Sequence, residues 1–413
     1  MRPIPAFRLI VAMGYPWFVV GIETKPADII MDYRLHSDPD RLAVEPPVKE
    51  TLIWDLPLRL FHWSMVCVVT VAALTGFFAP VGWLDVHTVA GYALSSLLAF
   101  RLAWGFFGGH FSKFKTFPLS RDRVIKHLGQ IIARKSPAHI GHNPTGALMI
   151  VVLLLGLIAV VLTGLVTLGG QEKLGPLAFI TSYKIGHFSK ELHEMAAFAV
   201  VGAIFIHLFG VFVETRVFKH RVIQAMVTGK KVTVGKFLIP KHRNGAPRGV
   251  ILSLLVPAVL IAGGTVLANK TPAGWKLLEI PAVYASECGD CHSAYHPSLR
   301  SAGAWQAVMA GLPDHFGEDA SLGQKTAGRI SAFLQANSAT TFDTKVARRV
   351  GRNDTKSLRM TDTPFWKKRH DEIDDAVFRM RGVGSKVNCN ACHKDAMSGR
   401  FGDANIHVPT GDK

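Results

Sequence analysis

The chain has 413 residues, 49% of which are hydrophobic, and its mean hydropathy is +0.24. A composition this apolar excludes an ordinary soluble protein and predicts a membrane protein that carries a soluble part. The formal net charge of +17 would suit a nucleic-acid partner, but the basic residues gather in two stretches between apolar runs. Such stretches are typical of cytoplasmic loops, so nucleic-acid binding is disfavoured.

Residues 1–49 precede the first long apolar segment. They contain the run FRLIVAMGYPWFVVGI, which resembles the apolar region of a secretory signal. Cleavage there would place the start of the first span outside the cell and reverse the charge pattern of the later loops. We therefore interpret 1–49 as a disordered cytoplasmic extension or a misassigned start, with Met31 as an alternative start.

Five apolar segments are each long enough to span a bilayer, which needs about 20 residues. They cover approximately 58–79, 86–107, 146–168, 192–213 and 249–268. The first four predict a bundle of two helical hairpins. The fifth has no ionisable side chain, so we expect a lipid-exposed anchor rather than part of a site.

The loops between these segments set the expected orientation. The loop after the second span carries seven basic residues against Asp122, and the loop after the fourth span carries nine basic residues. Both loops are therefore expected in the cytoplasm, because positively charged loops stay on that side. With five spans, the region after residue 269 then falls in the periplasm of a bacterium whose inner membrane holds the bundle.

Two CxxCH motifs in this C-terminal region account for four of the five cysteines. Their residues are Cys288, Cys291 and His292, then Cys389, Cys392 and His393. This spacing is typical of covalent c-type haem attachment, in which both thiols bond to the haem and the histidine ligates its iron. Zinc or disulfide sites are the alternatives, but they leave the paired histidines unexplained.

Each haem iron needs a sixth ligand if it only transfers electrons. We assign His315 to the first motif and His370, nineteen residues before Cys389, to the second. His407 is the main rival for the second haem. The remaining alternatives are His296, Met309, Met360, Met380 and Met397.

Four histidines lie in the apolar segments, where ionisable groups are functional by default. With alternating spans, His62 and His207 fall near the inner side of the membrane, and His87 and His193 fall near the outer side. The fourteen residues between His193 and His207 advance a helix by about 21 Å and bring it back to nearly the same face. Two stacked imidazole pairs in a four-helix bundle predict two b-type haems.

Arg101 follows His87 by fourteen residues and so lies at the inner depth, where it could pair with a haem propionate. Snorkelling to the cytoplasmic interface is the alternative for its side chain. The spans also carry small residues that let helices or a macrocycle approach closely, namely Gly76, Gly91, Gly164 and Gly202.

Over roughly residues 50–231, the chain resembles the bacterial cytochrome b561 and nickel-hydrogenase b-type subunit family. The resemblance lies in WDLPLRLFHW, HTVAGYAL, FRLAWGFFG, GHNPTGALM, ELHE and AMVTGKK. It implies two non-covalent b haems ligated at His62, His87, His193 and His207, and electron exchange with quinone. Residues 280–410 resemble the dihaem cytochrome c family, through HFGEDASL and the second CxxCH motif. That resemblance implies bis-histidine haems that exchange electrons with a periplasmic haem protein.

The expected fold is all-α. A transmembrane dihaem cytochrome b domain covers 50–231, and a basic cytoplasmic linker with the fifth transmembrane helix covers 232–269. A small, mostly helical periplasmic dihaem cytochrome c domain covers 270–413. The expected cofactors are two haem b and two haem c.

The predicted function is electron transfer between the quinone pool and a periplasmic haem protein, within a respiratory chain. As an enzyme, the chain would be a quinol:cytochrome c-type oxidoreductase. One alternative is a membrane anchor and electron-transfer subunit for a separate periplasmic redox enzyme. Another is a superoxide- or ligand-reactive haem protein, which needs an open coordination position and is disfavoured by the many candidate sixth ligands.

Overall fold

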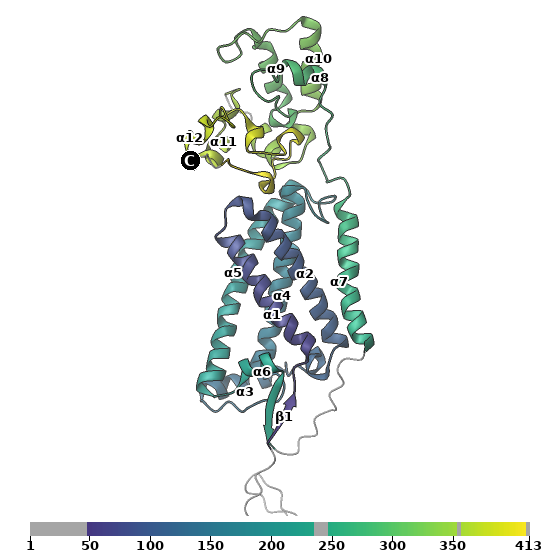
Figure 1. The fold of residues 1–413 in the computed structure, drawn as a ribbon, viewed down its shortest axis with the longest axis vertical. Coiled ribbons are helices and arrows are strands. Elements are labelled where there is room, and N and C mark those ends of the chain that lie inside the picture. Colours follow the sequence, from purple (N-terminus) through teal and green to yellow (C-terminus); the bar gives the residue numbers. More distant parts are fainter. Residues whose placement is uncertain (1–47, 235–246, 353–356, 410–413) are drawn as a thin grey trace, which may run out of the picture. The chain divides into compact units, whose positions relative to one another are not determined.

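The computed structural model describes residues 48–234, 247–352 and 357–409. The predicted extension before residue 48 and the middle of the basic linker lie outside the described residues. The described part is built of helices apart from one two-stranded sheet, which confirms the all-α class (Figure 1). Five of its helices are long and apolar enough to cross a membrane. They are α1 (Leu56–Phe77), α2 (Leu84–Phe107), α4 (Pro144–Thr167), α5 (Tyr183–Phe212) and α7 (Pro247–Ala268).

Side-chain caps mark where α1, α4 and α5 begin. A carboxylate oxygen of Asp55 accepts the N–H of Leu58 at the start of α1, and Ser182 caps α5 in the same way. Helix α5 therefore begins nine residues before the expected boundary at residue 192, because the polar stretch after Ser182 continues the helix. At its other end, α4 runs on through a π-turn, Leu168–Glu172.

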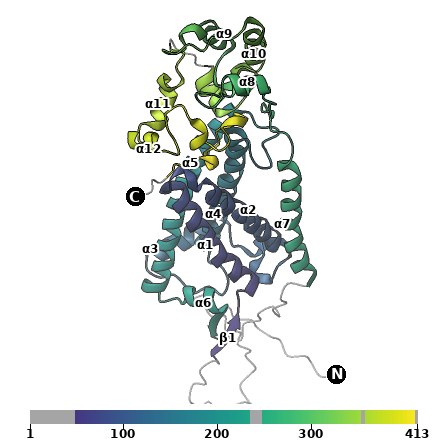
Figure 2. The ribbon, with the colours of Figure 1, turned by 45° about the horizontal axis from the view of Figure 1, so that its top comes forward.

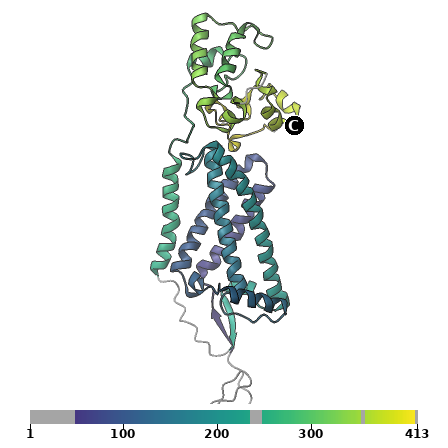
Figure 3. The ribbon, with the colours of Figure 1, turned by 180° about the vertical axis from the view of Figure 1, so that it is seen from behind.

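Helix α2 is the most buried of the five. Its residues Leu94 and Leu98 form one core with Leu154, Leu157 and Val200 from α4 and α5. Helix α1 packs along α2, and α4 packs along α5, as the two predicted hairpins require (Figure 3).

Helix α7 also packs along α2 (Figures 1 and 3). A Cβ added to Gly249 would lie 2.5 Å from the carbonyl oxygen of Phe107, so the backbones meet closely there. Most of its large apolar side chains are nevertheless exposed, as lipid contact requires. The prediction of a lipid-exposed fifth helix therefore applies to most of the surface of α7, and α2 covers one face, where Gly249 permits close contact.

Short elements close one end of the helical bundle. They are α3 (Arg121–Ile132), α6 (Val222–Thr228), and strands β1 (Val48–Leu52) and β2 (Lys230–Val234), which pair. A core of Ile53, Trp54, Leu58, Trp104 and Ala225 lies here. Within it, the Asp55 carboxylate also accepts hydrogen bonds from the Trp104 indole (3.2 Å) and the Ser112 hydroxyl (2.9 Å).

The C-terminal domain consists of short helices joined by long loops. They are α8 (Ala282–Glu287), α9 (Ala302–Ala310), α10 (Gln324–Ala336), α11 (Pro364–His370) and α12 (Asp375–Arg379). Helices α9 and α10 pack together around Trp305 and Ile330 in a first lobe (Figure 2). A second lobe is built around Leu299, Val350 and Met360. Each lobe holds one CxxCH motif.

Candidate haem-binding sites

His87 on α2 and His193 on α5 face each other inside the helical bundle. Their ring centres are 6.1 Å apart. An iron–nitrogen bond of about 2 Å on each side, plus about 1.1 Å from nitrogen to ring centre, separates two axial imidazoles by about 6 Å. The spacing of this pair therefore fits an iron held between the two rings.

The neighbouring hairpin helices orient both rings in the same manner. The Nδ1–H of His87 donates to the carbonyl oxygen of Ala72 (3.1 Å), and that of His193 donates to the carbonyl oxygen of Val160 (2.9 Å). The hydroxyl oxygens of Thr75 and Thr163 lie 3.1 and 3.3 Å from the same nitrogens. Each ring is thus left with a free Nε2 lone pair, which is the form that ligates iron.

Two of the four glycines singled out from the sequence lie against these rings. A Cβ on Gly76 would stand 3.0 Å from Cε1 of His87, and a Cβ on Gly164 would stand 3.1 Å from Cε1 of His193. Gly91 and Gly202 instead face open space, with nothing within 4 Å of an added Cβ. A glycine at each of these two positions leaves the space beside the imidazole that a flat macrocycle needs.

The sequence analysis missed the two threonines, although a signal for them exists. Thr75–Gly76 and Thr163–Gly164 both stand in the tripeptide LTG, once in each hairpin. The two hairpins repeat the same arrangement, in which the threonine and the carbonyl three residues before it receive the imidazole N–H of the partner helix. A comparison of the two hairpin sequences would have revealed this repeated LTG tripeptide.

His62 on α1 and His207 on α5 are the second predicted membrane pair, and this pairing stays a prediction. The His62 ring meets the Trp63 ring edge-on at 5.2 Å. Its Nδ1 is buried and has no hydrogen-bond partner among the described residues. This pair is therefore less firmly oriented by the protein than the His87–His193 pair.

Arg101 is 2% exposed and does not snorkel to the interface. Its guanidinium donates to the carbonyl oxygen of Ser112 (3.3 Å) and lies over the Phe114 ring at 4.7 Å. Asp55, which the sequence analysis quoted in WDLPLRLFHW without giving it a role, anchors Ser112 on the same side. A role for Arg101 toward a haem propionate stays a prediction.

In the first lobe of the C-terminal domain, His292 of the CGDCH motif and His315 have ring centres 6.4 Å apart, with an angle of 26° between the planes. The Nδ1–H of His292 donates to the carbonyl oxygen of Ser293 (2.9 Å), so its Nε2 is free. Tyr295 stacks on His292 at 4.9 Å. The structure therefore brings together the two residues that the sequence paired.

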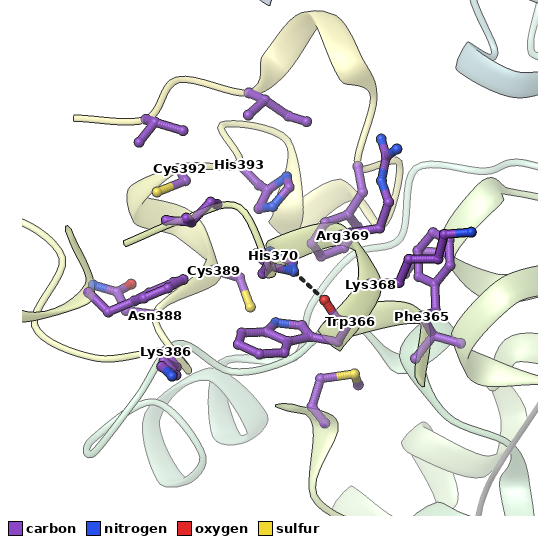
Figure 4. A pocket seen from close by; sticks show the side chains of 18 of the residues that line it. Phe365, Trp366, Lys368, Arg369, His370, Lys386, Asn388, Cys389, Cys392 and His393 are labelled. Carbon is purple, nitrogen blue, oxygen red and sulfur yellow. Dashed lines mark hydrogen bonds between the residues drawn. The ribbon is translucent and has the colours of Figure 1, made fainter. Parts of the chain in front are cut away.

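In the second lobe, Cys389, Cys392, His393 and His370 line one cavity of about 350 Å³ (Figure 4). The rings of His370 and His393 are 6.1 Å apart. The Nδ1–H of His370 donates to the carbonyl oxygen of Trp366 (2.8 Å), whose indole stacks on the imidazole at 4.4 Å. This cavity is lined by every group that a covalently attached, bis-histidine haem requires.

The rival ligands fit less well. His407 is exposed. His296 is buried, and its Nδ1 accepts the N–H of Ser298 (3.2 Å), which places its own proton on Nε2. A histidine that ligates iron through Nε2 would have to carry that proton on Nδ1 instead. Met360 does line the second cavity, but the ring of His370 faces His393.

Burial keeps the relevant groups of this domain uncharged. It lowers the pKa of His393 and of His296 to about 4, and it lowers the pKa of His315 and His370. Burial also raises the pKa of the Cys288 and Cys389 thiols to about 11. All five cysteines are free of disulfides, and no cluster of three or more metal-binding side chains occurs in the described part. A neutral imidazole is the form of histidine that ligates haem iron.

Comparison with known protein families agrees with this geometry. Residues 53–229 match the family model for prokaryotic cytochrome b561, and residues 284–401 match that for dihaem cytochrome c. The chain joins a cytochrome b561 to a dihaem cytochrome c. It is a multi-pass membrane protein that binds b- and c-type haem and transfers electrons.

Relatives cover each half separately. A probable Ni/Fe-hydrogenase B-type cytochrome subunit from Cupriavidus necator is 23% identical over 47% of this chain and 91% of its own length. One from Rhodobacter capsulatus is 22% identical over 50% of this chain and 91% of its own. The solved dihaem cytochrome c of Rhodobacter sphaeroides is 38% identical, over 30% of this chain and all of that one, with a TM-score of 0.27. The solved dihaem cytochrome c of Shewanella baltica is 32% identical. The match covers 32% of this chain and 95% of the Shewanella chain, with a TM-score of 0.25.

Proposed function

We propose that the protein passes electrons between the quinone pool and a periplasmic haem protein, and that it does so with two b haems and two c haems. The observation that carries this proposal is the set of imidazole pairs. Three of them have ring centres 6.1–6.4 Å apart, and we propose His62 and His207 as the fourth. Haem iron supplies one-electron transfer, and bis-imidazole ligation favours transfer over ligand binding because it leaves no open position.

In the proposed arrangement the bundle lies in the bacterial inner membrane and the C-terminal domain in the periplasm. The basic residues of the two long loops support this orientation. Helix α5 contributes His193 near one end and His207 fourteen residues later. The two membrane pairs therefore span most of the apolar layer, which suits transfer across it.

The residues of the protein have three tasks in this function. The carbonyl oxygens of Ala72 and Val160 hold the imidazoles of His87 and His193 in the ligating tautomer. The small residues beside them leave room for the macrocycle. In the C-terminal domain, four histidines would supply the ligands and the four thiols of the CxxCH motifs the attachment points.

Haem analysis provides the first test. A pyridine haemochrome assay on the purified protein should give equal amounts of haem b and haem c, with two of each per chain. Protein without extractable haem b would contradict the membrane sites, and protein with one c haem would contradict one of the CxxCH assignments.

The quinone step requires a kinetic test. Stopped-flow mixing with a quinol analogue should reduce the b bands first and the c bands afterwards. If an external reductant reduces the c haems while the b haems never exchange electrons with them or with quinol, the proposed chain of transfer is wrong.

A second function is favoured by the names of the relatives, which are Ni/Fe-hydrogenase subunits. In this alternative, the protein anchors a separate periplasmic redox enzyme and receives its electrons. Purification in mild detergent distinguishes the two. Stoichiometric recovery of a large redox enzyme supports the anchor, whereas quinol-driven reduction of a small haem protein by the isolated chain supports our proposal.

A further inference from the structure

A short segment after helix α4 contacts the C-terminal domain at several points. The segment covers residues 172–183, from the last residue of the π-turn to the first residue of α5. The N–H of Ala273 donates to the carbonyl oxygen of Ala178 (2.8 Å), and Arg400 donates to the carbonyl oxygen of Glu172 (3.0 Å). We call this segment the ledge.

The first charged contact centres on Lys345. Its ammonium group lies 3.0 Å from Glu172 on the ledge and 2.7 Å from Asp403 of the second lobe. The other oxygen of Glu172 accepts the backbone N–H of Asp403 (2.7 Å), and Glu172 is 7% exposed. Burial acts against the charged form of Lys345, but the two carboxylates outweigh it and raise the pKa of the ammonium group.

The second charged contact centres on Asp343. Its carboxylate accepts the backbone N–H of Tyr183 (2.7 Å), at the first residue of α5. It also pairs with Lys173 of the ledge (3.4 Å) and with Arg348 (2.7 Å). Both contacts are largely buried, and a buried charge that loses its partner is costly. The two contacts therefore hold the ledge and the domain together specifically.

The first contact belongs to the wall of the second haem cavity. Lys345 and Asp403 both line that cavity with Cys389 and His393. Ile406 also lines it and forms a β-bridge with His393. The carbonyl oxygen of Ile406 lies 3.8 Å from a Cβ added to Gly82, one turn before His87. The wall of the second cavity thus lies against the segment that leads into α2, five residues before His87.

The two CxxCH sites are in turn joined to each other. The Ser293 hydroxyl, next to His292, donates to the side-chain oxygen of Asn388, next to Cys389 (3.3 Å). The second motif is therefore linked both to the segment before α2, through Ile406, and to the first motif, through Asn388.

We propose that the Glu172–Lys345–Asp403 triad fixes the second CxxCH site, at Cys389 and His393, against the membrane bundle as the site adjoining the His87–His193 pair. Lys345 is a positioning residue whose charge also acts on a group bound at Cys389 and Cys392. The inference rests on the proposed function in one respect, which is that both CxxCH sites carry haem.

The test is a spectroelectrochemical titration of the purified holoprotein and two charge variants. A positive neighbour favours the reduced form of an iron centre, and a negative neighbour favours the oxidised form. Lys345→Met should therefore lower the midpoint potential of the second c haem, and Glu172→Gln should raise it. If the substitutions only loosened the structure, both variants would shift the midpoint potential in the same direction. A Cys288→Ala/Cys291→Ala background, which lacks the first c haem, identifies the haem that responds.

Glu50→Gln is the matched control, because it removes the same charge from an exposed ion pair with Lys230, between the paired strands β1 and β2. It should leave all potentials unchanged. Opposite shifts confined to the second c haem support the inference, and unchanged potentials or shifts in the first c haem overturn it. Failure of the proposed function gives a different result. Quinol would then reduce no haem, but the potential shifts of the two charge variants would persist.

A second measurement tests whether the two charged contacts hold the C-terminal domain on the bundle. A protease site inserted near the exposed Leu277 allows the connection between α7 and the C-terminal domain to be cut. After cleavage, the domain should stay on the detergent-solubilised bundle in the parent protein and dissociate in Glu172→Gln/Asp343→Asn. Dissociation of the domain in the parent protein, or its retention in the double variant, contradicts the proposed role of the two charged contacts.

Discussion

The membrane bundle and the C-terminal domain orient their histidines over very different distances along the chain. In the bundle, His87 donates to a carbonyl fifteen residues away and His193 to one thirty-three residues away, each on another helix. In the C-terminal domain, His292 donates to the next residue and His370 to the residue four positions earlier. Imidazole orientation therefore depends on helix packing in the bundle and on local chain conformation in the C-terminal domain.

This difference follows from how each cofactor would be held. A c-type haem is bonded to two thiols, so the attachment itself limits where the ligands must be. A b-type haem is retained only by its axial ligands and by the packing around it. A bundle that holds such a haem therefore depends on ligands that the protein itself orients, and the LTG tripeptides of α1 and α4 contribute to this for one of its two pairs.

The largest expected effect comes from removing a membrane ligand. His207→Ala should abolish the haem at the His62–His207 pair, halve the extractable haem b, and leave haem c unchanged. A haemochrome assay measures this directly. His110→Ala, which alters an exposed histidine, is the control. Loss of a c haem in the His207 variant would show that haem binding in the two regions is not independent.

Crowding a ring should have the next largest effect. Gly164→Val places side-chain atoms against Cε1 of His193, which is already 3.1 Å from the position of a Cβ. We expect reduced occupancy of the His87–His193 pair alone, read from the haem b content and redox difference spectra. Gly263→Val on α7 is matched in chemistry, because nothing lies within 4 Å of its Cβ, and it should retain full haem. Equal loss in both variants would mean that helix propensity, not ring position, is responsible.

A smaller effect is expected from pH in the C-terminal domain. Burial lowers the pKa of His296 to about 4, below its ordinary value of 6.5. The unfolded chain then binds more protons than the folded one between these values, so stability falls as pH drops from about 6.5 toward 4, by about 3 kcal/mol in total.

Thermal melting followed by near-ultraviolet circular dichroism at several pH values measures this effect. His296→Gln should flatten the dependence over the same range. A slope that is unchanged in the variant would assign the effect to other groups.

The smallest expected effect concerns the LTG threonines. Thr163→Val removes a hydroxyl oxygen 3.3 Å from Nδ1 of His193 while the Val160 carbonyl remains. A hydrogen bond is worth about 1 kcal/mol, which corresponds to about 40 mV in a one-electron couple. The midpoint potential of the haem at the His87–His193 pair should shift by no more than this amount. Thr265→Val on α7 is the control, and a shift at the His62–His207 haem would show that the two membrane sites are not independent.

Much of the molecule could be read from local patterns. Apolar length located the five spans, and CxxCH spacing predicted both covalent attachment sites, because each signal resides in a short stretch of chain. Periodicity placed His193 and His207 on one face, since a helix repeats its geometry regardless of its neighbours. The caps at Asp55 and Ser182 were also local signals, and reading the latter would have placed the start of α5 correctly.

Tertiary structure alone decided how distant segments meet. The burial of Arg101, the packing of α7 on α2, and the carbonyls that receive His87 and His193 depend on contacts between helices that no local pattern encodes. The same holds for the ion pairs of Glu172 and Asp343, whose partners lie about 170 residues away along the chain. Local chemistry thus determined which residues can hold haem, and long-range packing determined how they are oriented and which site adjoins which.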